Sequence, residues 1–333
     1  MMTRRDALAL PATLLTAHAA PALSRMGIAA TCFSAQRPKD TLEFLEFCRS
    51  LGAGGVQAPL SSTSPEHLAG LRRRAEQHGM YIEVMAGLPR GEDAETFERT
   101  LIAAGEVGAR CARVACLGGR RYEMFSRLDE WKQFAAGSRK AIARTLPLAE
   151  KHRMPVAIEN HKDWTLEELL ALLKEYSSEY IGVCLDTGNN IALLDEPMEF
   201  VERLSPYALS THLKDMAVEE YSEGFLLAEV PFGEGMLDMP RIAEIIRRAR
   251  PGTKMTLEMI TRDPLRIPCL TEKYWATFAD TSPQRLPAML RTVRAQAAKR
   301  IPRPGTVPPE IQANREADNV AACLRYARER MGL

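Results

Sequence analysis

The chain has 333 residues, a net charge of +1, and a composition of 46% hydrophobic and 26% charged residues. This is the balance of an ordinary globular protein that is long enough to bury one sizeable core. Lys and Arg number 44 against 43 Asp and Glu, so the composition gives no sign of the basic surface that binds nucleic acid. Seven cysteines without a CxxC pair give no sign of a zinc knuckle or a disulfide framework, and favour buried, reduced thiols.

The first 22 residues have the layout of a bacterial export signal. Arg4 and Arg5 precede an apolar stretch from Ala7 to about Ala17, and small residues follow. This stretch is shorter than the roughly 20 residues that span a bilayer. We therefore predict a twin-arginine-like signal peptide over residues 1–22, a periplasmic or exported protein, and no stable membrane anchor. A cytoplasmic protein with a frayed N-terminus is the alternative.

From residue 26 onward, short apolar runs alternate with amphipathic helical stretches. The runs are rich in Val, Ile, Ala and Leu, as expected of parallel strands buried on both faces. Eight such repeats predict an α/β fold, a (β/α)₈ TIM barrel over residues 26–300, and no GxGxxG follows the first strand to favour an open dinucleotide-binding sheet. The eight predicted strands are Gly27–Phe33, Gly55–Ala58, Tyr81–Ala86, Ala112–Leu117, Pro155–Glu159, Ile181–Leu185, Ala208–Lys214 and Lys254–Met259.

Two segments exceed a minimal barrel. Residues 261–282 follow the eighth predicted strand, which places them on the C-terminal face, where the active sites of TIM barrels lie. The segment 301–333 begins as a proline-rich linker and becomes helical from about Glu310 to Arg330. We expect this helix to pack outside the barrel or on a neighbouring subunit of a homo-oligomer.

Each of the last four predicted strands carries an ionisable residue at or near its end: Glu159, Asp186, His212 and Glu258. A charge at the end of a buried strand is costly unless it is paired or coordinates a metal. Neighbouring strands of a barrel place their ends side by side around its mouth. We therefore predict that three carboxylates and one imidazole hold one divalent cation, with Mn²⁺ first and Mg²⁺ or Co²⁺ as alternatives. Unrelated ion pairs at the barrel rim are the other explanation.

With these residues in this order, the chain resembles the xylose-isomerase-like TIM barrels of the sugar phosphate isomerase/epimerase superfamily. The resemblance runs from about residue 26 to residue 298. It is to the branch of ketose 3-epimerases, hydroxypyruvate isomerase and inosose dehydratase. The resemblance implies that the four strand-end residues bind one metal. It also implies that Glu159 and Glu258 are catalytic and move a proton at the substrate carbon.

The chemistry of such a site leaves two reactions open. A carboxylate beside a metal-polarised carbonyl can act as a general base, and the metal stabilises the resulting enediolate. The leading prediction is isomerisation or epimerisation of a ketose-like sugar. The alternative is a lyase or dehydratase of an inosose or 3-keto-glycoside, in which the same enediolate expels a leaving group. Ketose 3-epimerases that resemble this chain usually carry His three residues after the metal-binding Asp, where this chain has Asn189.

Two basic residues, His161 and Lys214, each lie two positions after a predicted ligand. Since residues i and i+2 share a face of a strand, His161 should point inward with Glu159, and Lys214 with His212. His161 is predicted to bind a substrate hydroxyl, and Lys214 to bind a hydroxyl or stabilise an oxyanion. The alternatives are a structural histidine at the rim and a salt bridge from Lys214 to a neighbouring aspartate.

The other predicted substrate-binding residues are Asn189, two residues of the extended loop and two near the third and fourth strands. Arg262 lies four residues beyond the last metal ligand, and Trp275 is expected to offer a sugar ring an apolar platform. Glu83 and Arg113 are expected to line the pocket. Packing within the loop is the alternative for Arg262 and Trp275.

Two other function classes remain to be weighed. The superfamily that the chain resembles includes apurinic endonucleases, which use a multi-zinc site rich in histidine. Of the six histidines here, only His161 and His212 lie at predicted strand ends, so we set nucleic acid aside as a partner. A non-catalytic sugar-binding barrel would be favoured by loss of a catalytic glutamate, yet both are present. We therefore predict an enzyme with a small-molecule sugar or polyol substrate.

Overall fold

The computed structural model describes residues 23–91, 94–279, 285–296 and 301–333. The predicted signal peptide, residues 1–22, lies outside the described residues. Among the helices of the described ranges, none combines the length and the apolar character that a membrane crossing requires.

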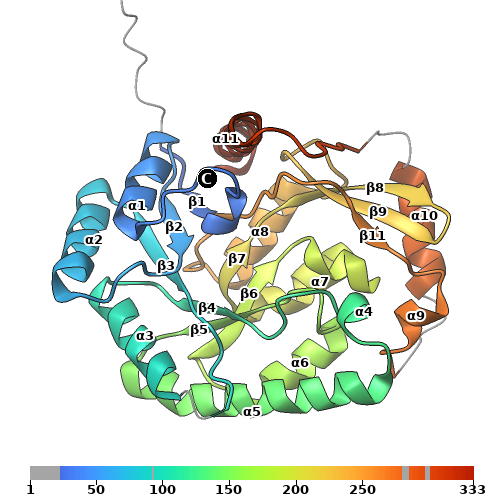
Figure 1. The fold of residues 1–333 in the computed structure, drawn as a ribbon, viewed down its shortest axis with the longest axis horizontal. Helices are drawn as coiled ribbons and strands as arrows, with labels where there is room; N and C mark the ends of the chain where they lie inside the picture. Colours follow the sequence, from blue (N-terminus) through green and yellow to red (C-terminus); the bar gives the residue numbers. More distant parts are fainter. Residues whose placement is uncertain (1–22, 92–93, 280–284, 297–300) are drawn as a thin grey trace, which may run out of the picture.

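Eight parallel strands form the centre of the molecule (Figure 1). Each strand pairs with the next around the sheet, and the first pairs with the last. A parallel bridge between Leu213 and Leu257 joins the remaining two edges, so the predicted (β/α)₈ barrel is confirmed. The strands are β1 (Gly27–Ala29), β2 (Gly55–Ala58), β3 (Tyr81–Met85), β4 (Ala112–Ala115), β5 (Val156–Glu159), β6 (Ile181–Asp186), β7 (Ala208–His212) and β10 (Thr256–Leu257).

Helices surround this barrel and cover its apolar outer face. Several begin at side-chain caps: Thr165 and Glu168 form a reciprocal capping box, and Ser64 caps a helix that starts with Pro65. The larger helices are α1 (Thr41–Ser50), α2 (Pro65–His78), α3 (Ala94–Glu106), α5 (Leu128–His152), α6 (Leu166–Glu175), α7 (Pro197–Leu204) and α8 (Met239–Ala249). Shorter turns are η1 (Ala30–Cys32), α4 (Arg121–Met124), η2 (Asn189–Leu193) and η3 (Ser205–Tyr207).

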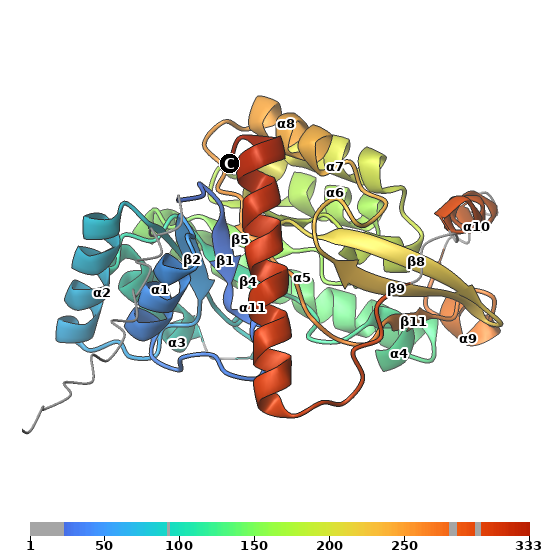
Figure 2. The ribbon, with the colours of Figure 1, turned by 90° about the horizontal axis from the view of Figure 1, so that it is seen from above.

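The C-terminal helix completes this ring. Helix α11 (Pro309–Tyr326), continued by the π-helical turn η4 (Ala327–Met331), lies between α1 and α8 (Figures 1 and 2). Its apolar face is buried in the main core. Near the middle of the helix, the Glu316 carboxylate accepts the backbone N–H groups of Ser34 and Ala35, at 3.1 and 3.2 Å, in the loop after η1. In the structure the helix therefore packs on the outside of this chain's own barrel.

A small antiparallel sheet, absent from the sequence-based expectation, stands beside the barrel mouth (Figure 2). It consists of the hairpin β8 (Asp215–Tyr221) and β9 (Gly224–Val230) with β11 (Leu265–Ile267). The hairpin was hard to foresee because its turn, Ser222-Glu223, lacks an Asn-Gly or Asp-Gly signature. Two further helices, α9 (Glu272–Trp275) and α10 (Arg285–Gln296), follow on this side.

One carboxylate fastens the hairpin to the glycine-rich turn after it. Asp215 accepts the backbone N–H groups of Met216, Gly233, Gly235 and Leu237 at 2.8 to 3.1 Å. Gly233 has φ of +85°, and a Cβ on Gly235 would lie 2.1 Å from the Asp215 carboxylate. These contacts support the interpretation of the turn as mainly structural.

Candidate metal centre at the barrel mouth

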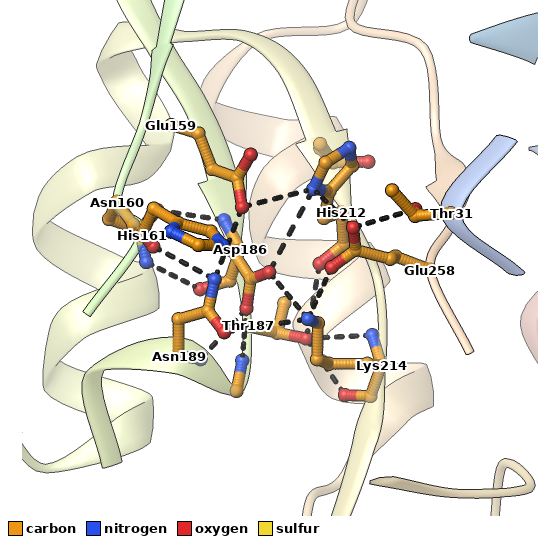
Figure 3. A network of polar contacts seen from close by, with 12 residues as sticks. Thr31, Glu159, Asn160, His161, Asp186, Thr187, Asn189, His212, Lys214 and Glu258 are labelled. Carbon is orange, nitrogen blue, oxygen red and sulfur yellow. Dashed lines mark hydrogen bonds and ion pairs between the residues drawn. The ribbon is translucent and has the colours of Figure 1, made fainter. Parts of the chain in front are cut away.

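Four buried side chains converge at the carboxyl ends of consecutive strands (Figure 3). Nδ1 of His212 lies 3.4 Å from Oε1 of Glu159, 3.8 Å from Oδ2 of Asp186 and 3.5 Å from Oε1 of Glu258. One ligand atom from each residue lies within 4.8 Å of the others. The structure thus brings the four residues named from the sequence into one group that can bind a divalent metal ion.

The imidazole of His212 presents a free lone pair to this group. Its Nε2 is 2.6 Å from Oε1 of Gln57, and because an amide oxygen only accepts, the proton lies on Nε2. Nδ1 is buried and has no hydrogen-bond partner among the described residues. Burial lowers the pKa of His212 to about 4, so the ring is neutral at neutral pH. A neutral imidazole nitrogen facing three carboxylates is a donor set that fits a divalent cation.

Glu83 lies behind this histidine rather than among the ligands. Its Oε2 accepts hydrogen bonds from Nε2 of Gln57 at 2.9 Å, Oγ of Ser210 at 2.7 Å and Oγ1 of Thr256 at 3.2 Å. Burial raises the pKa of its carboxyl group. Glu83 therefore fixes Gln57, which in turn orients His212. Sequence reasoning missed Gln57, although a polar residue in a buried strand was a signal.

The ligand carboxylates also contact two cations. Arg113 forms an ion pair with Glu159, and Lys214 forms one with Asp186 at 2.8 Å and another with Glu258. Burial opposes the charge of Lys214, but the two carboxylates outweigh it and raise the pKa of the lysine. Burial likewise opposes ionisation of Glu258, but His212 and Lys214 hold its pKa well below the usual value. Lys214 points inward as expected, and its ion pair with Asp186 is the salt bridge that the sequence left open as the alternative.

Asn189 connects the ligand group to two lysines. Its Nδ2 donates to Oε1 of Glu159 at 3.2 Å and to the carbonyl of Asn160 at 3.1 Å. Its Oδ1 accepts from the ammonium of Lys162 and, at 3.5 Å, from that of Lys214. The amide therefore orients a ligand carboxylate on one side and gathers positive charge on the other.

Asn160 and Lys162 were missed by the sequence analysis. Asn160 locks β5 to β6, since its side chain accepts the N–H of Asp186 at 2.8 Å and donates to the Asp186 carbonyl at 2.9 Å. Lys162 has φ of +60°, and its side chain is buried against Asn189. Strand alternation would place both residues facing away from the site. It does not apply because β5 ends at Glu159.

His161 lies at the margin of the group. Its Nδ1 donates to the carbonyl of Leu117 at 2.8 Å, which leaves Nε2 as an acceptor. Burial, with the charges of Lys162 and Arg113, lowers the pKa of His161 to about 3, so the ring is neutral. Binding of a substrate hydroxyl by His161 stays a prediction.

The two residues of the extended loop have partners of their own. Arg262 pairs with Glu229 of β9 at 2.6 Å, and the charges of both act on the ammonium of Lys162. Trp275 donates Nε1 to the carbonyl of Cys269 at 2.8 Å and packs against neighbouring aromatic rings of the loop. Trp275 thus makes the contacts of loop packing, the alternative that the sequence left open.

A cavity of about 640 Å³ opens next to this loop, between the hairpin and the start of α11. Its lining includes Glu229, Met259 and Arg262, and Arg315 and Asn319 of α11. Charged and apolar side chains share its lining, and its size suits a small molecule.

Comparisons with known proteins agree with this architecture. A sequence profile described as a xylose isomerase-like TIM barrel matches residues 45–281. A curated relative, the 3-oxo-isoapionate decarboxylase of Pectobacterium atrosepticum, is 27% identical over 216 residues, which are 63% of this chain and 74% of that protein.

Solved structures share the fold at low sequence identity. A D-psicose 3-epimerase, crystallised in the presence of D-fructose, aligns with a TM-score of 0.59 at 16% identity, covering 92% of this chain and 99% of that chain. A xylose isomerase-like TIM barrel protein from Mycobacterium smegmatis, in complex with magnesium, aligns with a TM-score of 0.56 at 16% identity, covering 80% of this chain and 98% of that chain.

Proposed function

Because the chain belongs to the xylose isomerase-like TIM-barrel family, we propose that it is a divalent-metal-dependent isomerase or epimerase of a ketose-like sugar. The observation that supports this most directly is the placement of two glutamates. Glu159 and Glu258 come from β5 and the end of β10, which are not neighbouring strands, and lie on opposite sides of the ligand group (Figure 3). A proton can be removed on one face of a substrate carbon and returned on the other.

The metal in this proposal is held by Glu159, Asp186, His212 and Glu258. Mn²⁺ is the ion that we propose, with Mg²⁺ and Co²⁺ as alternatives, because three of the four ligands are hard carboxylate oxygens. When bound, the ion supplies Lewis-acid polarisation of a substrate carbonyl.

The side chains of the site then divide the proton transfer among them. One of the two glutamates is ionised and takes the proton from the carbon next to the carbonyl, while the other starts the turnover protonated and supplies its proton to the opposite face. The protonated ammonium of Lys214 lies beside Glu258, where it can donate a hydrogen bond to the oxygen that gains negative charge. Arg113 and Asn189 hold the Glu159 carboxylate in place.

Hydrogen exchange with solvent tests this proposal. Protein loaded with Mn²⁺ is incubated in D₂O with free ketoses, keto sugar acids, inososes and 3-keto-glycosides, and NMR follows the carbon next to the carbonyl. Deuterium should enter that position in at least one substrate, together with formation of an isomer or epimer. Metal-loaded protein that exchanges no proton in any ketose-like sugar would refute the proposal.

A lyase is the second candidate, and the curated decarboxylase relative favours it. In a decarboxylation, the bond from the carboxylate carbon to its neighbour breaks, CO₂ leaves, and the electron pair moves onto the carbonyl oxygen. One proton is then returned to carbon, so a single acid suffices. In a dehydratase, the enediolate expels a β-hydroxyl instead. Release of CO₂ or water in place of an epimer distinguishes these outcomes from isomerisation.

For the location of the protein we propose export through the twin-arginine-like segment. The first described strand begins at Gly27, so the barrel needs no strand from residues 1–22. In the native host the mature protein should begin near Ala20 or Leu23 and lie outside the cytoplasm, as N-terminal sequencing of cell fractions would show. Cytoplasmic protein that retains Met1 would contradict export.

A further inference from the structure

Lys162 is a buried ammonium group without a carboxylate partner. The residue is 4% exposed, and among the described residues its side chain hydrogen-bonds only the neutral amide oxygen of Asn189 and forms no ion pair. The carboxylates of Asp186 and Glu229 act on it only from a distance. A buried charge without a counter-ion is destabilising unless another group compensates it.

The backbone at Lys162 is strained, and its neighbours hold the strain in place. Its φ of +60° is in the left-handed region, which costs a long side chain roughly 1 kcal/mol or more. The N–H of Arg121 donates to the Lys162 carbonyl at 3.0 Å. The Asp163 carboxylate accepts the N–H groups of His161 and Trp164 at 3.1 and 2.8 Å. The loop is thus built to keep this ammonium at the edge of the ligand group.

The charges around the ligand group leave positive charge unbalanced once a metal binds. The three ligand carboxylates face the two cations Arg113 and Lys214, so one negative charge remains. A divalent cation turns this into one positive charge, and Lys162 adds a second. Both Lys162 and Lys214 are directed at the same oxygen of Asn189, which carries no charge to offset them.

We propose that Lys162 binds a carboxylate of the substrate, so that the enzyme acts on a sugar acid rather than on a neutral sugar. This inference rests on the proposed metal-dependent function and narrows its substrate class. Lys214 is already engaged by Asp186 and Glu258, whereas Lys162 retains donors for an anion. Of the two surplus positive charges, one offsets the oxygen that gains negative charge during proton transfer, which leaves one for a singly charged carboxylate and none for a phosphate dianion.

Calorimetric titration of the Mn²⁺-loaded protein with a matched pair of probes tests this. D-Gluconate and D-sorbitol share a six-carbon polyol chain, but gluconate carries a carboxylate where sorbitol carries a hydroxymethyl group. Gluconate should bind at least about 10-fold more tightly, and Lys162→Met should weaken gluconate binding by about 10- to 100-fold while leaving sorbitol unchanged. Lys273→Met, which removes an exposed lysine from the loop on the same face, should keep the wild-type preference.

A stability measurement separates this role from a structural one. In metal-loaded protein, Lys162→Met should leave the melting temperature unchanged or raise it, because an apolar side chain of similar shape replaces a charge that the bound metal leaves uncompensated. Lys162→Gln keeps an amide donor for Asn189 without the charge, and should lose the gluconate preference equally.

Three results would overturn the proposal: no difference between gluconate and sorbitol, including no binding of either; an undiminished preference in both Lys162 variants; or tighter binding of sorbitol 6-phosphate than of gluconate. The proposed function is judged separately, by metal content and by exchange in D₂O.

Discussion

Strands β5, β6, β7 and β10 each lead to a proposed metal ligand, whereas β1 to β4 each carry, or are followed by, a side chain that supports this group directly or through a neighbour. The four supporting side chains are Thr31, Gln57, Glu83 and Arg113. Thr31, just after β1, donates to Glu258 at 2.8 Å, Gln57 contacts His212, Glu83 contacts Gln57, and Arg113 pairs with Glu159. We call these the ligand half and the support half of the barrel mouth. The comparison suggests that one half carries the chemistry and the other sets its geometry and charge.

The largest expected effect is on turnover, from changes in the ligand half. Glu159→Gln and Glu258→Gln keep the shape of the side chain but remove the base, so each should reduce turnover by about 10²- to 10⁴-fold. Steady-state kinetics and deuterium incorporation measure this. Equal losses support epimerisation, which needs both glutamates. If one variant keeps substantial activity while Lys214→Met or His161→Phe fails, elimination is favoured, and wild-type rates in both Gln variants would sink the proposed chemistry.

Removal of a ligand should also release the metal. We expect about one divalent ion per wild-type chain by elemental analysis, and its near-complete loss in His212→Ala or Asp186→Ala. Chelation should lower the melting temperature of the wild type, since a ligand present at about 100 times its Kd stabilises the fold by about 2.7 kcal/mol. The two variants should show no such response. Full stability and activity in metal-free wild type would contradict the assignment.

The same comparison shows what the sequence can and cannot reveal. An apolar run that ends in a charged residue can be recognised in the sequence itself. The barrel and the ligand half could therefore be predicted from their strand-forming runs and from the residues at the ends of those runs. Gln57 could not be assigned, because its function depends on the register that places β2 across the barrel from His212. Lys162 could not be assigned for a local reason. Its left-handed backbone conformation breaks the alternation of side-chain direction that holds within a strand. The hairpin β8–β9 lacked a turn signature.

A change in the support half should therefore act through the ligand half, with a smaller effect. Gln57→Leu removes the acceptor for Nε2 of His212, which frees the ring to rotate or change tautomer. Metal affinity should fall by about 10- to 100-fold, as is usual when such a supporting contact is lost. Competition with a chromophoric chelator measures it. The exposed Gln77→Leu is the matched control. Unchanged affinity in Gln57→Leu would mean that the two halves are not coupled.

The smallest expected effect is on the stability of the metal-free protein at mildly acidic pH. His212 has a folded pKa of about 4, below its usual value of 6.5, because it is buried. The unfolded chain therefore binds this proton more readily, and the fold loses stability as pH falls from 6.5 towards 4. Between about pH 7 and pH 5 the loss from this one group should be roughly 2 kcal/mol. Urea unfolding of wild type and His212→Gln at both pH values, with chelator present, isolates it.

Other buried groups, such as Asp163 and Asp195, whose pKa values burial raises to about 6, contribute to both proteins alike. The wild type should lose more stability than the variant over this interval. An equal loss in both would show that the imidazole of His212 is not held neutral, and with it the free lone pair at Nδ1 would be in question.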